Sequence, residues 1–285
     1  MNQPVYAVSA LRRPGALATM FVYRLIAGLL VAAPVAAVVA GSGLFSFPQG
    51  DAGVFAPGGD ALVDLALTSG SYLASALCES GFLFVVLAGL GLLPSAVWLA
   101  ALGRGGQLSL AESWALAIRH LPRLALLSGV GLLLGSLLAV LAGLGYSALA
   151  DPLAARLDER QAALWRAASL LPWLPVFSVL AILTDLARAA VIQHDAGIRA
   201  ALRVALRAFR AKKLLLISSW LTPHLWSVAL VAGVAMLVEQ VAVQQPGGWR
   251  VLGAWLLHQL AVLLLLVLRG SWHSRALASA GAVRP

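Results

Sequence analysis

Six apolar segments, nearly free of charge, constrain the fold of this chain more than any other feature. They cover residues 20–40, 82–102, 124–149, 167–185, 214–238 and 251–268. Each approaches or exceeds the roughly 20 residues that a helix needs to cross a bilayer. Inside lipid, a segment must satisfy its own backbone hydrogen bonds, and none of the six has the two-residue alternation of a membrane barrel strand. The sequence therefore predicts an all-α polytopic membrane protein with six transmembrane helices.

The composition supports this interpretation. The chain of 285 residues is 61% apolar and 11% charged, whereas soluble domains average about 45–50% and 25%. One soluble domain cannot bury that excess, because the core that it can hide is limited by its size. The net charge of +9 could indicate nucleic-acid binding, but the basic residues form short clusters beside apolar segments. We therefore expect no nucleic-acid partner. Cys78 is the single cysteine, which excludes an internal disulfide.

The first apolar segment could also be a cleaved signal peptide, because Arg12 and Arg13 precede it. The apolar region of a signal peptide is about 7 to 15 residues long. This segment is longer and contains Arg24, which favours a span that is retained.

The basic residues indicate which side of the membrane each loop faces. Sixteen of the twenty Lys and Arg residues fall on one side, and the other side holds four of them together with eight of the eleven acidic residues. Basic residues accumulate on the cytoplasmic side, so both termini are predicted to be cytoplasmic. An even number of spans requires both termini to lie on the same side, which agrees with this prediction. Eighteen of the basic residues are Arg, which is typical of a GC-rich bacterial genome, and we expect the bacterial inner membrane.

The run RAALRVALRAFRAKK at 199–213 carries six positive charges and no negative one. At 100° per residue, its arginines fall within an arc of about 80°, and apolar side chains including Ile198, Leu202, Ala205 and Phe209 form an adjoining face. This pattern predicts a helix that lies on the cytoplasmic surface of the membrane, with anionic lipid head groups as its partners. The predicted head-group contacts are Arg199, Arg203, Arg207, Arg210, Lys212 and Lys213.

Two polar residues are placed to cap such surface helices. Asp195 precedes the basic run, where it could cap the start of the helix. Ser109 and Glu112 have the spacing of a capping box before an equivalent segment.

An internal repeat is visible when residues 114–129 are laid over residues 204–219, with a fainter third copy at 9–17. Each copy precedes a pair of apolar segments. The chain then forms a single transmembrane domain of three pseudo-repeated units, each a cytoplasmic amphipathic helix followed by a helical hairpin. The units cover about 1–102, 103–192 and 193–285, and their axis of symmetry would run along the membrane normal.

The segment LTDLARAAVIQHDAGIRAALRVALRAF at 183–209 resembles bacterial six-helix membrane proteins related to the membrane domain of glycerophosphodiester phosphodiesterases. It is a span that ends in Asp and Arg, followed by an acidic-Ala-Gly junction and an Ala/Arg amphipathic helix. In that family the catalytic domain is a separate soluble barrel, which this chain cannot form. The resemblance therefore implies an integral membrane module without phosphodiesterase chemistry of its own.

Ionisable residues inside apolar segments are candidates for a functional site. Asp185 and Arg188 lie three residues apart on one helical face, either as a structural ion pair or as a gate or substrate contact. His224 follows Pro223, which should kink the fifth segment, and His258 with Gln259 lies at a comparable depth in the sixth. The two histidines could be buried imidazoles or could carry protons. These five polar residues, without the proline, form the candidate intramembrane site.

Small residues recur at every fourth position in two segments. The first contains Gly28, Ala32, Ala36 and Ala40, and the third contains Gly131, Gly135, Ala139, Gly143 and Ser147. Such stripes let helices approach closely, and packing is the simpler interpretation. The alternative is a groove that is lined for a ligand.

No pattern in the sequence indicates catalysis. The five histidines and one cysteine show no metal-ligand spacing, and no phosphate loop or nucleophile motif is present. We expect no enzyme activity, metal or cofactor. The leading hypothesis is a membrane protein with a structural, assembly or partner-binding role, the partner being another protein or a second copy of the chain. The alternative is a transporter or channel for a small solute or lipid that uses Asp185, Arg188, His224 and His258.

Overall fold

The computed structural model describes residues 10–42, 67–103, 108–150, 152, 157–240 and 248–283, which are helical throughout apart from short turns. The elements are η1 (Ala10–Arg12), α1 (Pro14–Gly41), α4 (Gly70–Leu90), α5 (Leu92–Leu102), α6 (Leu110–Gly145), η4 (Tyr146–Ala150), α8 (Glu159–Leu170), α9 (Trp173–His194), α10 (Ile198–Gln240) and α11 (Gly248–Gly281). No strand occurs in the described ranges. The predicted all-α class is therefore confirmed.

Six stretches of helix are long and apolar enough to cross a membrane, and each overlaps one of the predicted segments. They are Pro14–Gly41, Gly70–Leu102, Leu110–Ala148, Glu159–His194, Ile198–Val238 and Trp249–Gly281. Many large apolar side chains along them are exposed, including Leu132 and Leu133 of α6 at 73% and 71%. An apolar surface of this extent needs lipid as its solvent, which is the expectation for a multi-pass membrane protein.

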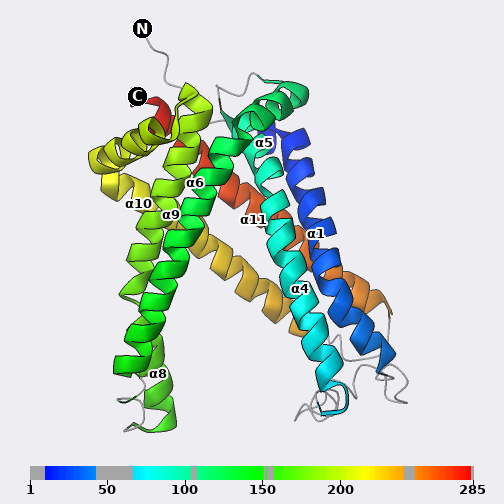
Figure 1. Cartoon of the computed structure of the whole chain (residues 1–285). Helices are drawn as coiled ribbons and strands as arrows, with labels where there is room; N and C mark the ends of the chain where they lie inside the picture. Colours follow the sequence, from blue (N-terminus) through cyan, green and yellow to red (C-terminus); the bar gives the residue numbers. More distant parts are fainter. Residues whose placement is uncertain are drawn as a thin grey trace. The chain divides into compact units, whose positions relative to one another are not determined.

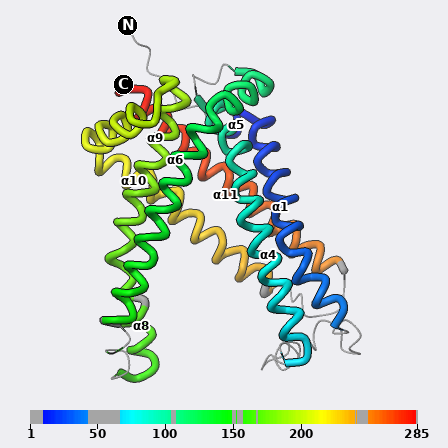
Figure 2. Tube along the Cα trace, in the orientation of Figure 1, coloured from blue at the N-terminus to red at the C-terminus, as the bar shows by residue number. Residues whose placement is uncertain are grey.

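The chain folds as two compact units, and α10 and α11 contribute to both. The α1–α4 unit comprises Ala10–Trp98 and Pro223–Gly270, and within it α1 and α4 lie side by side (Figure 1). The α6–α9 unit contains Leu99–Thr222 and the C-terminal segment from Ser271. Within this second unit, α6 and α9 run side by side (Figure 2). The division into three repeated units stays a prediction.

The contact between α6 and α9 depends on two glycines of the small-residue stripe. A Cβ atom on Gly131 would lie 3.0 Å from both Cγ2 and Oγ1 of Thr184, and one on Gly135 would lie 3.9 Å from Leu180. The Thr184 hydroxyl donates a hydrogen bond of 2.9 Å to the carbonyl of Leu180, which fixes its rotamer. Close packing of the two helices therefore explains this part of the stripe.

The basic run forms the first part of α10, and the backbone breaks at its end. Lys212 has φ −139° and ψ 36°, which is not helical, so two helices meet there just before the predicted span begins. On the first part, Ala201, Val204, Ala205 and Ala208 are buried. Leu202, expected on the same apolar face, is 46% exposed, because the face that packs against the protein is centred on the small residues.

The predicted capping box at the start of α6 is confirmed. The backbone N–H of Glu112 donates to Ser109 Oγ at 3.2 Å, and the backbone N–H of Ser109 donates to Glu112 Oε2 at 2.6 Å. Two backbone donors that the helix cannot satisfy are thereby bonded. The position where α6 begins is fixed by these local interactions.

We expect Gly131→Val to lower the thermal stability of the protein in detergent, because its side chain must displace Thr184 at the α6–α9 contact. Overpacking of this kind costs about 1 to 3 kcal/mol. Gly129→Val is the matched control, since it adds the same β-branched residue to the same helix and its Cβ meets nothing within 4 Å. Melting followed by tryptophan fluorescence compares the two, and equal melting temperatures would contradict the packing role of Gly131.

Candidate functional site

Asp185 of α9 is the centre of a polar cluster in the α6–α9 unit. Its Oδ2 accepts a hydrogen bond of 2.7 Å from the indole N–H of Trp272, and its Oδ1 lies 3.7 Å from the Arg188 guanidinium. His273 Nε2 is 4.0 Å from the same carboxylate. The side chain of Asp185 is only 16% exposed. A carboxylate in such surroundings is stable only when donors or cations of this kind surround it.

The elements that carry these residues explain the geometry. Asp185 and Arg188 are three residues apart, so they share one face of α9. Trp272 and His273 come from the C-terminal part of α11, and both are buried. The Trp272 ring packs as a large apolar group, while its N–H finds the one acceptor that a buried indole requires. The cluster therefore ties α9 to the end of α11.

A second cluster surrounds Asp195, which ends α9 in the left-handed region with φ 52° and ψ 32°. Its carboxylate accepts hydrogen bonds of 2.6 Å from Arg119 and from Arg123, both on α6. Arg123 also donates to the Asp195 carbonyl at 3.1 Å, and His120 Nδ1 lies 3.5 Å from the carboxylate. The hydrogen bond from Arg123, assisted by the charges of Arg119 and His120, holds the pKa of Asp195 below its usual value.

The expected capping role of Asp195 is therefore wrong. Helix α10 begins at Ile198, three residues further on, and the Asp195 side chain bonds to α6 instead of to the first turn of α10. Two guanidinium donors outcompete a backbone amide for the carboxylate, because charge-assisted hydrogen bonds are the stronger kind. Asp195 fastens the turn between α9 and α10 to α6.

A third contact joins the same parts of the α6–α9 unit. His194 Nε2 lies 2.9 Å from the carbonyl oxygen of Ala280, near the end of α11. A Cβ on Gly281 would lie 3.9 Å from the side-chain amide carbon of Gln193. Together with Asp185 and Asp195, this contact holds α6, α9 and the end of α11 in one arrangement.

The structure brings together only part of the predicted site. Asp185 and Arg188 meet in the α6–α9 unit, whereas His224, His258 and Gln259 belong to the α1–α4 unit. His258 is exposed, and its Nδ1 lies 2.8 Å from the Ala254 carbonyl of its own helix. His224 and Gln259 are half-buried. The site of five residues therefore stays a prediction.

Sequence reasoning missed the partners from α11 and α6. Trp272 follows the apolar segment 251–268, which is the usual place for an interfacial tryptophan. Nothing in the local sequence pairs it with a carboxylate that lies 87 residues earlier. Arg119 and Arg123 are four apart and thus on one helical face, which could have suggested a shared anionic partner.

The described residues contain no group of three or more His, Cys, Asp or Glu side chains that could hold a metal ion. Both carboxylates of the clusters are engaged by donors of the chain itself. The arrangement can fix helices in place, and it offers one buried ion pair that a moving part could break.

The predicted lipid-contact residues are accessible. The arginines at 199, 203, 207 and 210 and the lysines at 212 and 213 are all exposed. Their guanidinium and ammonium groups can thus reach a partner outside the chain. Contact with lipid head groups stays a prediction for these six residues.

We expect acid to weaken the Asp195 cluster. A carboxylate with a lowered pKa in the folded state stabilises the fold above its usual pKa of 3.8, and this contribution is lost as the pH falls through the lower folded value. Melting temperatures should therefore fall more between neutral pH and about pH 3 in the parent protein than in Asp195→Asn. Identical pH profiles would show that the carboxylate charge does not hold the turn.

Comparison with protein-family models, with curated proteins and with solved structures finds no match to this chain. The resemblance to the membrane domain of glycerophosphodiester phosphodiesterases therefore rests on residues 183–209 alone and stays a prediction.

Proposed function

We propose that this chain is a multi-pass protein of the bacterial cytoplasmic membrane that has a structural, assembly or partner-binding role and catalyses no reaction. The carrying observation is the Asp185 cluster, in which Trp272, Arg188 and His273 of the same chain surround the carboxylate. The polar groups at this depth are used to hold helices together. The exposed apolar surfaces of the helices are then left to contact lipid and a partner in the membrane.

The surface of α10 supports contact with the cytoplasmic leaflet. Its exposed arginines share the first part of the helix with Leu202 and Leu206, which are 46% and 39% exposed. Leucine side chains beside arginines are the pattern of a helix that lies at the interface, where each basic group is attracted by anionic lipids. This placement agrees with cytoplasmic termini.

The alternative function is transport or conduction of a small solute or lipid. It would use the Asp185–Arg188 pair as a gate, together with His224 and His258. A gate must open, and the pair would then exchange its internal partners for a substrate. The hydrogen bond from Trp272 and the fixed end of α11 favour the structural role instead.

The two functions predict opposite effects on stability. If the Asp185 cluster is structural, Asp185→Asn lowers the melting temperature, because breaking a buried ion pair costs about 3 to 5 kcal/mol when one partner is left behind. Trp272→Phe keeps the aromatic packing and removes only the N–H donor. This loss should lower the stability of the fold by about 1 to 3 kcal/mol. Since the two residues share one hydrogen bond, the double variant should lose less stability than the two single variants lose in sum.

A gate would give a different result. When a residue is kept for function at the expense of stability, replacing it usually stabilises the protein. A raised melting temperature for Asp185→Asn would therefore contradict the structural proposal and favour transport. Arg275→Gln, an exposed charge on the same part of α11, is the control for a general effect of removing charge.

The orientation of the chain in the membrane can be tested by labelling single cysteines from one side. Single cysteines at Ala163 and Ala282, both exposed, are introduced after Cys78→Ser. With cytoplasmic termini, a membrane-impermeant maleimide added to intact spheroplasts should label position 163, and position 282 should react only after permeabilisation. Labelling of position 282 from outside would reverse the proposed orientation.

A further inference from the structure

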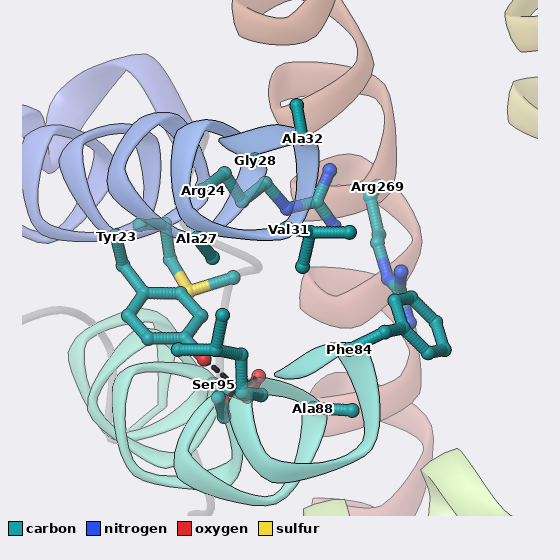
Figure 3. A pocket seen from close by; sticks show the side chains of 13 residues that line it. Tyr23, Arg24, Ala27, Gly28, Val31, Ala32, Phe84, Ala88, Ser95 and Arg269 are labelled. Carbon is teal, nitrogen blue, oxygen red and sulfur yellow. Dashed lines mark hydrogen bonds between the residues drawn. The ribbon is translucent and has the colours of Figure 1, made fainter. Parts of the chain in front are cut away.

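The α1–α4 unit contains a half-open cavity of about 700 Å³, which is bounded by α1, α4, the start of α5 and α11. Ligand sites in proteins have volumes of about 300 to 1,000 Å³. Arg24 extends into this space from α1 toward α11, and Arg269 extends from α11 toward Phe84 of α4 (Figure 3). The described residues that line it include no carboxylate.

The two arginines have no anionic partner among the residues that the structure describes. Within the described part of the chain, neither forms an ion pair, and they lie close enough for their like charges to interact. Arg24 is half-buried in one of the apolar spans. A charge in that position is costly unless it is paired, and a second positive charge beside it adds to the cost. An anion bound between the two guanidinium groups would relieve both penalties.

The position of Arg269 is fixed by the residue after it. A Cβ on Gly270 would come within 2.6 Å of both Ala10 Cβ and Trp98 Cζ2. Only glycine allows α11 to pack this closely, and Trp98 is itself 2% exposed. The packing therefore holds the arginine at the mouth of the cavity.

The cavity changes from polar to apolar along α1. At the level of Arg24 lies Tyr23, whose hydroxyl donates to the Leu87 carbonyl, and Ser95 Oγ donates to the Gly91 carbonyl at 2.7 Å. One to two turns further along α1, the lining consists of small and apolar residues: Ala27, Gly28, Val31, Ala32 and, from α4, Phe84. A ligand that fits both ends has an anionic head and an apolar tail.

The small-residue stripe of α1 thus differs from that of α6. A Cβ added to Gly28 would meet nothing within 4 Å, so no helix packs against it. Gly28 and Ala32 line open space instead. This open space fits the alternative interpretation of the small-residue stripe, which is a groove lined for a ligand.

We propose that this cavity binds an anionic phospholipid, with the phosphate between Arg24 and Arg269 and an acyl chain along Gly28 and Ala32. Guanidinium groups bind phosphate oxygens through paired, charge-assisted hydrogen bonds. The half-open shape lets the second chain remain in the bilayer. Placement in the cytoplasmic leaflet rests on the proposed orientation, whereas the binding itself does not.

The test measures lipid retention by the purified full-length chain. The protein is delipidated in mild detergent, titrated with phosphatidylglycerol or with phosphatidylcholine, and examined by native mass spectrometry. The parent chain should bind phosphatidylglycerol more tightly. Arg24→Gln/Arg269→Gln should weaken that binding at least about tenfold, since each lost hydrogen bond to a charged group is worth an order of magnitude or more.

The matched control removes the same total charge elsewhere. Arg12 and Arg275 are exposed and do not line the cavity, so Arg12→Gln/Arg275→Gln should keep its affinity for phosphatidylglycerol. A second variant, Gly28→Leu, fills the apolar end where there is room for a side chain. It should weaken binding of both lipids while the melting temperature is unchanged or raised.

Three results would overturn the proposal. Equal affinity of the Arg24/Arg269 variant and its control would show that the two arginines only extend toward the membrane surface. A melting temperature that inorganic phosphate raises as much as phosphatidylglycerol does would identify a site for a free anion. Unchanged lipid binding in Gly28→Leu would show that no acyl chain occupies the cavity. None of these outcomes depends on whether the labelling experiment supports cytoplasmic termini.

Discussion

The central constraint on this molecule is the absence of water around most of its length. A helix in hydrocarbon satisfies its own backbone, but a polar side chain in it must find a partner within the protein or reach the interface. Asp185 satisfies this requirement through a tryptophan and an arginine. Asp195, just outside the span, uses two arginines of α6. The contacts that hold α6, α9 and the end of α11 together follow from that requirement.

Small residues meet the same constraint in two different ways. Helices in lipid gain no hydrophobic driving force from associating, so they must approach closely to gain van der Waals contact. Gly131 allows this against Thr184 of α9. Gly28 has the same spacing pattern, but a Cβ added there would meet nothing within 4 Å in the described part of the chain, and it lines a cavity instead. A stripe of small residues therefore allows close approach to a helix, but it does not determine whether a second helix or an open cavity lies beside it.

Properties set by neighbouring residues were predictable from the sequence, while those that join distant segments were not. The six apolar segments and the capping box at Ser109 follow from local pattern, and the structure has a long apolar helix at each segment and the capping box itself. The pairing of Asp185 with Arg188 follows from helical spacing. Its bond to Trp272 and the attachment of Asp195 to α6 depend on tertiary packing. No periodicity within one helix encodes such contacts.

Arginine takes three roles in this chain, and the differences lie in what surrounds each guanidinium. On α10 the arginines are exposed and free to meet head groups, whereas Arg119, Arg123 and Arg188 are neutralised by carboxylates of the chain. Arg24 and Arg269 differ from both groups, because they line one cavity, and the described residues around it include no acid. Sequence alone counts all of them as cytoplasmic positive charge. Only the geometry separates the arginines that pair with carboxylates of the chain from the two that line a cavity.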